Sequence, residues 1–285
     1  MSKLSKFLTL LRPKQWIKNV LLFAAPFGAG IVPTENEYIL LGKSFVVFCL
    51  ISSIGYVIND WIDRESDRTH LKKKFRPFAS RSISGTECVG TLLLLGALAS
   101  FLSYNLPANF HICAISYLAV TVSYSTFVKK IAVFELIWVS LGFLIRTLAG
   151  ASVVGVFVSQ WFLIVASFGS LFIITTKRLA EFRLYQTDSS RKVLREYSEG
   201  FLESVITLSV AVTLTCYALW AFDVASGNEW ARISLLPVTV GILRYFLHTE
   251  KVTSENPENS LFNDRLVPVS GAITLLCLIL AVYVG

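Results

Sequence analysis

The sequence predicts an all-α membrane protein with nine transmembrane helices and a cytoplasmic N-terminus. Three observations lead to this fold class: 54% of the 285 residues are hydrophobic, apolar runs recur along the whole chain, and basic residues gather in alternate links between those runs. Only 16% of the residues are charged and mean hydropathy is +0.63, which excludes a disordered chain and argues against an ordinary soluble domain. We expect one integral-membrane domain covering residues 1–285.

The nine expected spans cover about residues 16–33, 40–60, 86–104, 108–125, 133–152, 158–177, 200–222, 230–247 and 266–284. Each is near the ~20 residues that an α-helix needs to cross ~30 Å of hydrocarbon. Helices are expected because lipid offers no partners to backbone polar groups, and the sequence shows no alternating pattern of a membrane β-barrel.

The links between the spans alternate in charge. Lys and Arg number five in residues 3–18, seven in 64–81, two at 129–130, six in 177–195 and two in 251–265, whereas the links near 33–39, 105–107, 153–157 and 223–229 have none. Basic residues accumulate in cytoplasmic loops, so we expect the N-terminus in the cytoplasm and the C-terminus outside. The net charge of +7 is therefore mainly a topology signal, and no motif indicates a nucleic-acid partner.

Cysteine and histidine indicate no separate site. The five Cys are scattered without a CxxC pair and are expected to be buried free thiols, and the three His lack metal-ligand spacing. The basic N-terminal segment lacks a short apolar core followed by a cleavage site, so we expect it to be a retained amphipathic segment and not a signal peptide.

An acidic cluster closes the second span, in the stretch "NDWIDRESD". Asp60, Asp63 and Asp67 are spaced three and four residues apart, which places them on one face of a continuing helix, and Asn59 lies one turn before Asp63. Neighbouring carboxylates repel and are costly beside a bilayer, and a divalent cation with hard oxygen ligands removes both problems. The pattern predicts a Mg²⁺ site, with Mn²⁺ as a substitute. The alternative is a solvated helix end, with Asp60 paired to Arg64.

Basic residues follow the acidic cluster at once, in the stretch "RTHLKKKFRP". Such cations suit the charge of a phosphorylated substrate that a metal holds only in part. The candidates for phosphate binding here are Arg68, Lys73, Lys74 and Arg76.

The motif NDxxDxxxD at the cytoplasmic end of the second of nine spans resembles the first Asp-rich motif of the UbiA superfamily of intramembrane prenyltransferases. The resemblance implies a UbiA-like helix bundle in which Asn59, Asp60, Asp63 and Asp67 hold Mg²⁺ against a substrate diphosphate.

A second motif separates members of that superfamily. Typical prenyltransferases carry DxxxD after the sixth span, whereas this chain reads "TTKRLAEFR", with Lys177, Arg178 and Glu181. Cations at this place would bind phosphate directly instead of through further metal ions. The alternative is that Lys177 and Arg178 are ordinary cytoplasmic flanks, with Glu181 paired to Lys177.

Five segments resemble, in the same order, the branch of the superfamily formed by decaprenyl-phosphate phosphoribosyltransferases. They are "LRPKQWIKNVLLFAAPFGAG", "NDWIDRESDRTHLKKKFRP", "YSTFVKKIAVFELIWVSLGFLIRTLAGA", "SFGSLFIITTKRLAEFR" and "PENSLFNDRLV". The resemblance implies transfer of 5-phosphoribosyl from phosphoribosyl diphosphate (PRPP) to a polyprenyl phosphate in the membrane, with release of diphosphate. It places Asp60, Asp63 and Lys177 in catalysis, at a site facing the cytoplasm from the inner membrane, and makes the product a precursor for cell-envelope glycans.

Further polar residues in these segments are candidates for substrate binding. Glu135 and Arg146 stand eleven residues apart within the fifth span, where charges indicate a functional site; a structural pair bridged by polar groups is the alternative. Lys18 and Asn19 come from the first matching segment, and Tyr124 and Lys130 flank the turn after the fourth span. The resemblance also suggests Tyr197 and Arg265, which match the family pattern.

Two other functions fit parts of the sequence. A prenyltransferase joining a polyprenyl diphosphate to an aromatic acceptor would be favoured by a DxxxD motif, which "KRLAE" replaces. A transporter would place acids near the bilayer midplane in broken helices with inverted repeats, whereas these acids lie at one rim and no repeat is detected. The sequence leaves open whether the chain forms a homo-oligomer.

Overall fold

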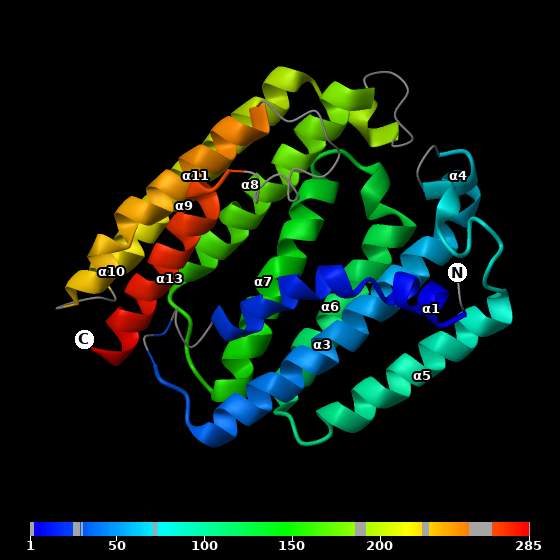
Figure 1. Cartoon of the computed structure of the whole chain (residues 1–285), viewed down its shortest axis with the longest axis horizontal. Helices are drawn as coiled ribbons and strands as arrows, with labels where there is room; N and C mark the ends of the chain where they lie inside the picture. Colours follow the sequence, from blue (N-terminus) through cyan, green and yellow to red (C-terminus); the bar gives the residue numbers. More distant parts are fainter. Residues whose placement is uncertain are drawn as a thin grey trace. The chain divides into compact units, whose positions relative to one another are not determined.

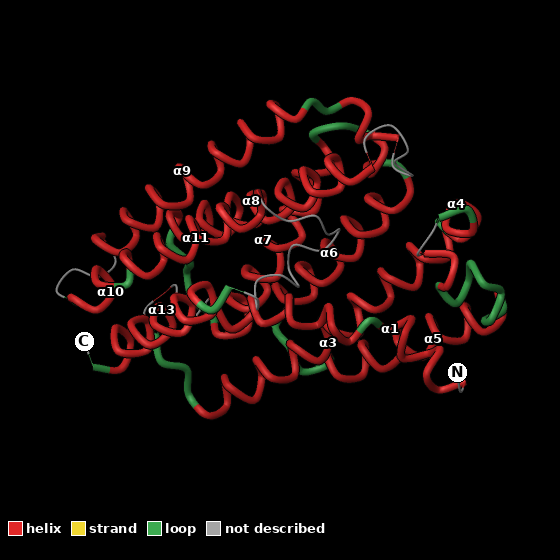
Figure 2. The backbone as a smooth tube through the Cα atoms, turned by 45° about the horizontal axis from the view of Figure 1, so that its top comes forward, coloured by secondary structure: helices red, strands yellow, loops and turns green. Residues whose placement is uncertain are grey.

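The computed structural model describes residues 3–24, 29, 31–70, 73–185, 192–223, 228–250 and 264–284. Within these ranges every regular element is helical (Figure 2). In chain order they are α1 (Lys3–Leu11), η1 (Pro13–Phe23), α3 (Glu35–Ile62), α4 (Arg64–Arg68), η2 (Lys73–Phe75), α5 (Gly85–Ser103), α6 (Ala108–Thr126), η3 (Val128–Lys130), α7 (Phe134–Val154), α8 (Gln160–Tyr185), η5 (Lys192–Glu196), α9 (Glu199–Asp223), α10 (Glu229–Ile233), α11 (Leu235–Glu250) and α13 (Leu266–Tyr283).

Six helical segments of the described chain are long and apolar enough to cross a membrane. They are Glu35–Ile62, Gly85–Ser103, Phe134–Val154, Gln160–Leu184, Glu199–Asp223 and Glu229–Leu247. Leu266–Ala281 is a shorter apolar helix, and α6 coincides with the expected span 108–125 but falls outside these six. The all-helical prediction is confirmed, while the count of nine spans and their orientation stay predictions.

The first expected span differs from the structure. Residues 13–23 form a 3-10 helix, η1, instead of the start of an α-helix running to residue 33. At about 2.0 Å per residue, eleven residues of 3-10 helix are roughly 22 Å long, which is less than the hydrocarbon thickness. Pro13 stands at the start of η1, where its missing N–H costs no hydrogen bond. Part of 24–33 lies outside the described residues.

Two compact units make up the chain, and α7 contributes to both. The first comprises residues 1–25, 33–131 and 145–156, and the second comprises 26–32, 132–144 and 157–285. The expectation of a single domain stays a prediction.

In the first unit, α3 is the central helix and packs against α1, η1, α5 and α6 (Figure 1). It begins with a capping box, in which Thr34 and Glu37 satisfy each other's backbone N–H groups. The segment of α7 in this unit approaches η1 closely, because a Cβ at Gly150 would overlap the backbone of Leu22. Only glycine fits this contact, which fixes η1 beside α7.

In the second unit, α8 packs along α9, and α11 packs against α13. The start of α7 joins them through a buried core that includes Leu136, Leu194, Leu202 and Ile206. The same core includes Leu179 of the stretch "TTKRLAEFR".

Candidate active site

The helix that carries the acidic cluster breaks inside it. α3 ends at Ile62, Asp63 is its C-cap, and the short helix α4 follows with Asp67 in it. Asp60 and Asp67 are buried, whereas Asp63 is only half-buried. Asp60 and Asp67 share Arg76, whereas Asp63 bonds to Lys129. The expectation that the three carboxylates share one helical face stays a prediction.

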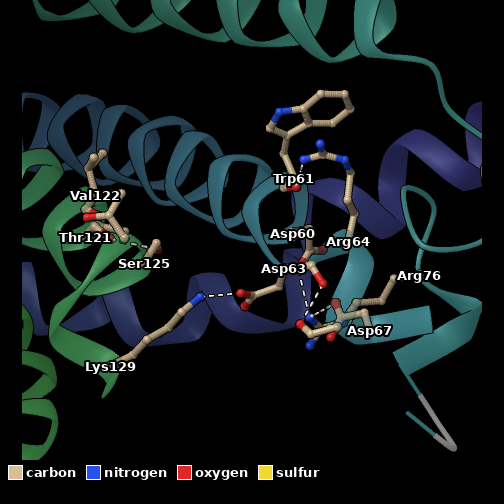
Figure 3. A network of polar contacts seen from close by, with 12 residues as sticks. Asp60, Trp61, Asp63, Arg64, Asp67, Arg76, Thr121, Val122, Ser125 and Lys129 are labelled. Atoms are coloured by element: carbon tan, nitrogen blue, oxygen red, sulfur yellow. Dashed lines mark hydrogen bonds and ion pairs between the residues drawn. The ribbon is translucent and has the colours of Figure 1, made fainter. Parts of the chain in front are cut away.

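Asp60 and Asp67 converge on one arginine (Figure 3). The Nη1 atom of Arg76 donates to Asp67 Oδ2 at 2.7 Å and to Asp60 Oδ1 at 3.1 Å. Arg12 reaches the same Asp60 oxygen from the N-terminal segment, with its Nη2 atom at 2.5 Å. Burial raises the pKa of Asp67, and the charges of Arg76 and Lys73 oppose that rise. Two buried acids are thus compensated by two cations from segments far apart in the sequence.

Asp63 has a different partner, Lys129 of η3, whose Nζ bonds to Asp63 Oδ1 (Figure 3). The neighbouring Lys130, which the sequence suggested for phosphate binding, is exposed. In a three-residue 3-10 turn, successive side chains point about 120° apart, so only one of the two lysines can face Asp63. The adjacent lysines were visible in the sequence, but their spacing did not show which one meets the acid.

Arg64 does not pair with Asp60, although the alternative of a solvated helix end expected this pair. Its guanidinium lies 4.2 Å from the ring centroid of Trp61, and its Nη1 donates to the Trp61 carbonyl at 2.7 Å. The expected pair of Asp60 with Arg64 is therefore wrong, since Asp60 forms ion pairs with Arg12 and Arg76.

The other cations near the acids vary in exposure. Arg68 bonds to Glu65 and donates to the Ala79 carbonyl at 3.3 Å. Lys73 is half-buried, and Lys74 is exposed with its Nζ 5.3 Å from the ring centroid of Phe75. Among the described residues of the basic run, Arg76 contacts both Asp60 and Asp67.

The oxygen donors at this place fit a hard divalent cation such as Mg²⁺, which needs only one or two carboxylates beside water and phosphate oxygens. Among the described residues, no three His, Cys, Asp or Glu side chains form a ready-made metal cluster. The acids instead bond to Arg12, Arg76 and Lys129, so a metal would have to replace some of these contacts. Asn59 is half-buried in the last turn of α3.

A second polar cluster in the first unit surrounds Arg146 of α7, which is buried. Its Nε donates to Asn19 Oδ1 at 2.8 Å, its Nη2 donates to Tyr117 Oη at 2.6 Å, and its guanidinium lies 4.4 Å from the centroid of the Tyr117 ring. Ser52 bonds to both Asn19 and Tyr117, at 3.3 and 3.4 Å. The structure thus brings two sequence candidates, Asn19 and Arg146, together with Tyr117, which sequence reasoning missed because a tyrosine in an apolar span gives no signal.

The second unit holds an ion-pair cluster at the start of α7. Arg178 binds Glu135 with two hydrogen bonds, Nε to Oε1 at 2.6 Å and Nη2 to Oε2 at 2.8 Å, and both residues are buried. Its third nitrogen, Nη1, donates to Glu181 at 3.0 Å. Glu135 therefore pairs with Arg178 and not with Arg146, so the two charges of α7 serve different clusters in different units.

Most of the remaining candidates are also described in the structure. Tyr197 is buried, and its hydroxyl accepts a hydrogen bond from the Val133 N–H at 2.8 Å. Burial is the main cause that raises the pKa of Tyr197 to about 12. Lys18, Tyr124 and Lys177 are half-buried, and Arg265 is exposed before α13.

The model of the UbiA prenyltransferase family matches residues 20–263. The chain belongs to the UbiA prenyltransferase family. This UbiA protein is therefore a multi-pass membrane protein, and residues 20–263 contain the acidic cluster, the Arg146 cluster without Asn19, and the cluster around Arg178.

Two relatives that cover most of the chain have the same name. The chain is 36% identical over 284 residues to the decaprenyl-phosphate phosphoribosyltransferase of Corynebacterium glutamicum, covering 96% of this chain and 86% of the relative. It is 37% identical over 265 residues to the protein of the same name from Mycobacterium tuberculosis, covering 90% and 87%.

Solved structures support the UbiA fold. The structure of a UbiA homolog from Archaeoglobus fulgidus bound to DMAPP and Mg²⁺ matches with a TM-score of 0.75 at 21% identity, over 97% of each chain. The same homolog bound to GPP and Mg²⁺ also matches with a TM-score of 0.75, at 19% identity. At this identity the likeness concerns the fold alone.

Proposed function

We propose that this UbiA protein transfers a 5-phosphoribosyl group from PRPP to a polyprenyl phosphate and releases diphosphate. The observation that carries the proposal is the 36–37% identity, over 90–96% of the chain, to relatives named decaprenyl-phosphate phosphoribosyltransferase. The replacement of DxxxD by "KRLAE" supports the same assignment, because it departs from the second motif of the prenyltransferases.

The diphosphate of PRPP would lie at the acidic cluster. Asp60, Asp63 and Asp67, with Asn59 beside them, offer the oxygen ligands for Mg²⁺. When bound, this ion supplies positive charge to the oxygens of the leaving diphosphate. Arg76 and Lys129 stand against the carboxylates and present donors that suit phosphate.

The reaction is a displacement at the anomeric carbon. An oxygen of the acceptor phosphate forms the new bond to C1 while the bond from C1 to the diphosphate oxygen breaks, and the electron pair leaves with the diphosphate. The transition state is oxocarbenium-like, as in other glycosyl transfers. The acceptor is already an anion at neutral pH, so the chain needs no general base and contributes by holding two like-charged substrates together.

The location of the reaction follows from the charge pattern. The acidic cluster and the basic runs at 64–81 and 177–195 belong to links that the positive-inside rule assigns to the cytoplasm. PRPP is a water-soluble substrate, so we propose a site that faces the cytoplasm from the inner membrane. The product would be a lipid-linked phosphoribose for cell-envelope glycans.

The test is turnover by the purified full-length protein in lipid nanodiscs. Labelled PRPP and decaprenyl phosphate should yield a labelled lipid only when Mg²⁺ is present. Asp60→Asn and Asp63→Asn should lower turnover at least a hundredfold if each carboxylate supports the leaving group. Glu65→Gln is the matched control, because Glu65 lies on the same segment but is exposed.

The assay also distinguishes the phosphoribosyltransferase from the second candidate function, an aromatic prenyltransferase. A prenyltransferase would ignore PRPP and instead join a prenyl diphosphate to an aromatic acid. Turnover of that pair together with inactivity towards PRPP would overturn the proposal.

A further inference from the structure

Arg12 connects the N-terminal segment to the carboxylate at the end of α3. Its Nη2 atom lies 2.5 Å from Asp60 Oδ1, and its guanidinium lies 5.3 Å from the ring centroid of Tyr56. The side chain of Asp60 is 2% exposed, whereas that of Arg12 is 27% exposed. The pair therefore joins a buried acid to a cation that a ligand can reach.

The backbone of Arg12 is in an unfavourable conformation. Its φ of 50° and ψ of 59° lie in the left-handed region, which residues with a Cβ rarely adopt. Arg12 is the N-cap of η1, yet its side chain makes no capping hydrogen bond, so side-chain capping does not explain the strain. Strained residues of this kind concentrate at functional sites, where the surrounding structure holds them in place.

Contacts on both sides of Arg12 hold it in place. The Ser53 hydroxyl donates to the Leu11 carbonyl at 3.0 Å, and the Trp16 indole Nε1 donates to the same hydroxyl at 3.1 Å. Both contacts attach the N-terminal segment to α3, two turns before Asp60. The fold thus directs the guanidinium of Arg12 at the acidic cluster.

We propose that Arg12 is a diphosphate-binding residue that pairs with Asp60 in this structure and exchanges it for a diphosphate when a divalent cation binds the carboxylates. The inference rests on the proposed function only in taking diphosphate as the group held at the acidic cluster. The planar guanidinium forms charge-assisted hydrogen bonds equally well with carboxylate and phosphate oxygens. Arg76 also contacts Asp60 and Asp67 in this structure, at 3.1 and 2.7 Å.

The exchange couples two binding events. A metal on Asp60 frees Arg12 for the diphosphate, and a diphosphate on Arg12 frees Asp60 for the metal. Each ligand must therefore raise the affinity of the other by the same factor. The bound cation and the diphosphate also attract each other directly, so a purely structural Arg12 would leave that direct coupling unchanged and add nothing to it.

The experiment measures Mn²⁺ binding by electron paramagnetic resonance on the purified full-length protein, with and without inorganic diphosphate. In the wild type, diphosphate should tighten Mn²⁺ binding, and the exchange at Arg12 should supply about tenfold of this effect, the value of one charge-assisted hydrogen bond. In Arg12→Gln, Mn²⁺ alone should bind more tightly than to the wild type, and diphosphate should tighten Mn²⁺ binding by about tenfold less than in the wild type. Arg64→Gln is the matched control, because Arg64 lies near the acids but contacts Trp61; it should behave as the wild type.

Coupling in Arg12→Gln equal to that of the wild type would overturn the inference. If Arg12→Gln does not fold, Arg12→Lys decides, because it keeps the charge while losing the planar fork, and it should retain part of the coupling. PRPP turnover combined with unchanged coupling in the Arg12 variants would reject the role of Arg12 alone. Inactivity towards PRPP with intact coupling would reject the phosphoribosyl assignment and leave Arg12 as a diphosphate ligand.

Discussion

The buried pair of Arg178 and Glu135 allows a direct test of whether Arg178 stabilises the fold or binds substrate. Glu135 is 0% exposed and Arg178 is 4% exposed, so Arg178→Gln leaves a buried carboxylate without its two hydrogen bonds from arginine. It also leaves two acids, Glu135 and Glu181, near each other. Removing one member of a buried ion pair costs about 3–5 kcal/mol.

Substitutions at Arg178, Glu135 and Arg183 should lower the free energy of unfolding by different amounts. Glu135→Gln should cost less, about 1–3 kcal/mol, because Arg178 keeps its hydrogen bond to Glu181 at 3.0 Å. Arg183→Gln is the matched control on the same helix, since Arg183 pairs with the exposed acids Glu199 and Glu203. Exposed pairs contribute about 0–1 kcal/mol.

The assay is thermal unfolding of the purified variants. Unfolding is measured as the loss of the fraction of protein that remains monodisperse after heating. At about 2–4 °C per kcal/mol, Arg178→Gln should lower the Tm by about 6–20 °C, and Arg183→Gln by less than about 4 °C. The PRPP KM of folded Arg178→Gln should stay near that of the wild type. A Tm within 2 °C of the wild type together with a raised KM would refute this reasoning and support the sequence prediction that Arg178 contacts substrate.

Three further predictions follow from the described contacts. Lys129→Gln should raise the PRPP KM about tenfold through loss of a charged hydrogen bond, whereas the exposed Lys130 should tolerate the same change; equal kinetics for both variants would contradict this. Gly150→Ala should lower stability by about 1–3 kcal/mol, because its Cβ meets the backbone of η1, whereas Gly42→Ala, with open space around it, should be neutral or stabilising in a melting experiment. Tyr197→Phe should lose about 1 kcal/mol equally at pH 6 and pH 9, because a pKa of about 12 keeps the hydroxyl protonated throughout; a loss that changes with pH would show another titrating partner.

The sequence by itself determined the membrane class, the helical fold and the family. Hydropathy, the alternation of basic links and the NDxxDxxxD motif are local properties, so they can be recognised without knowing which segments pack together. The same local signals predicted Asp60, Asp63 and Arg76 as site residues, and the structure joins Asp60 to Arg76.

Only the tertiary structure decided which charges meet. Arg12 and Asp60 are 48 residues apart, Lys129 and Asp63 are 66 apart, and Arg178 and Glu135 are 43 apart. Helical spacing predicts partners only within a turn or so, which is why it suggested Arg64 for Asp60. The packing of distant segments selects the actual partners, because a buried charge is stable only where a packed segment brings it a counter-charge or hydrogen bonds.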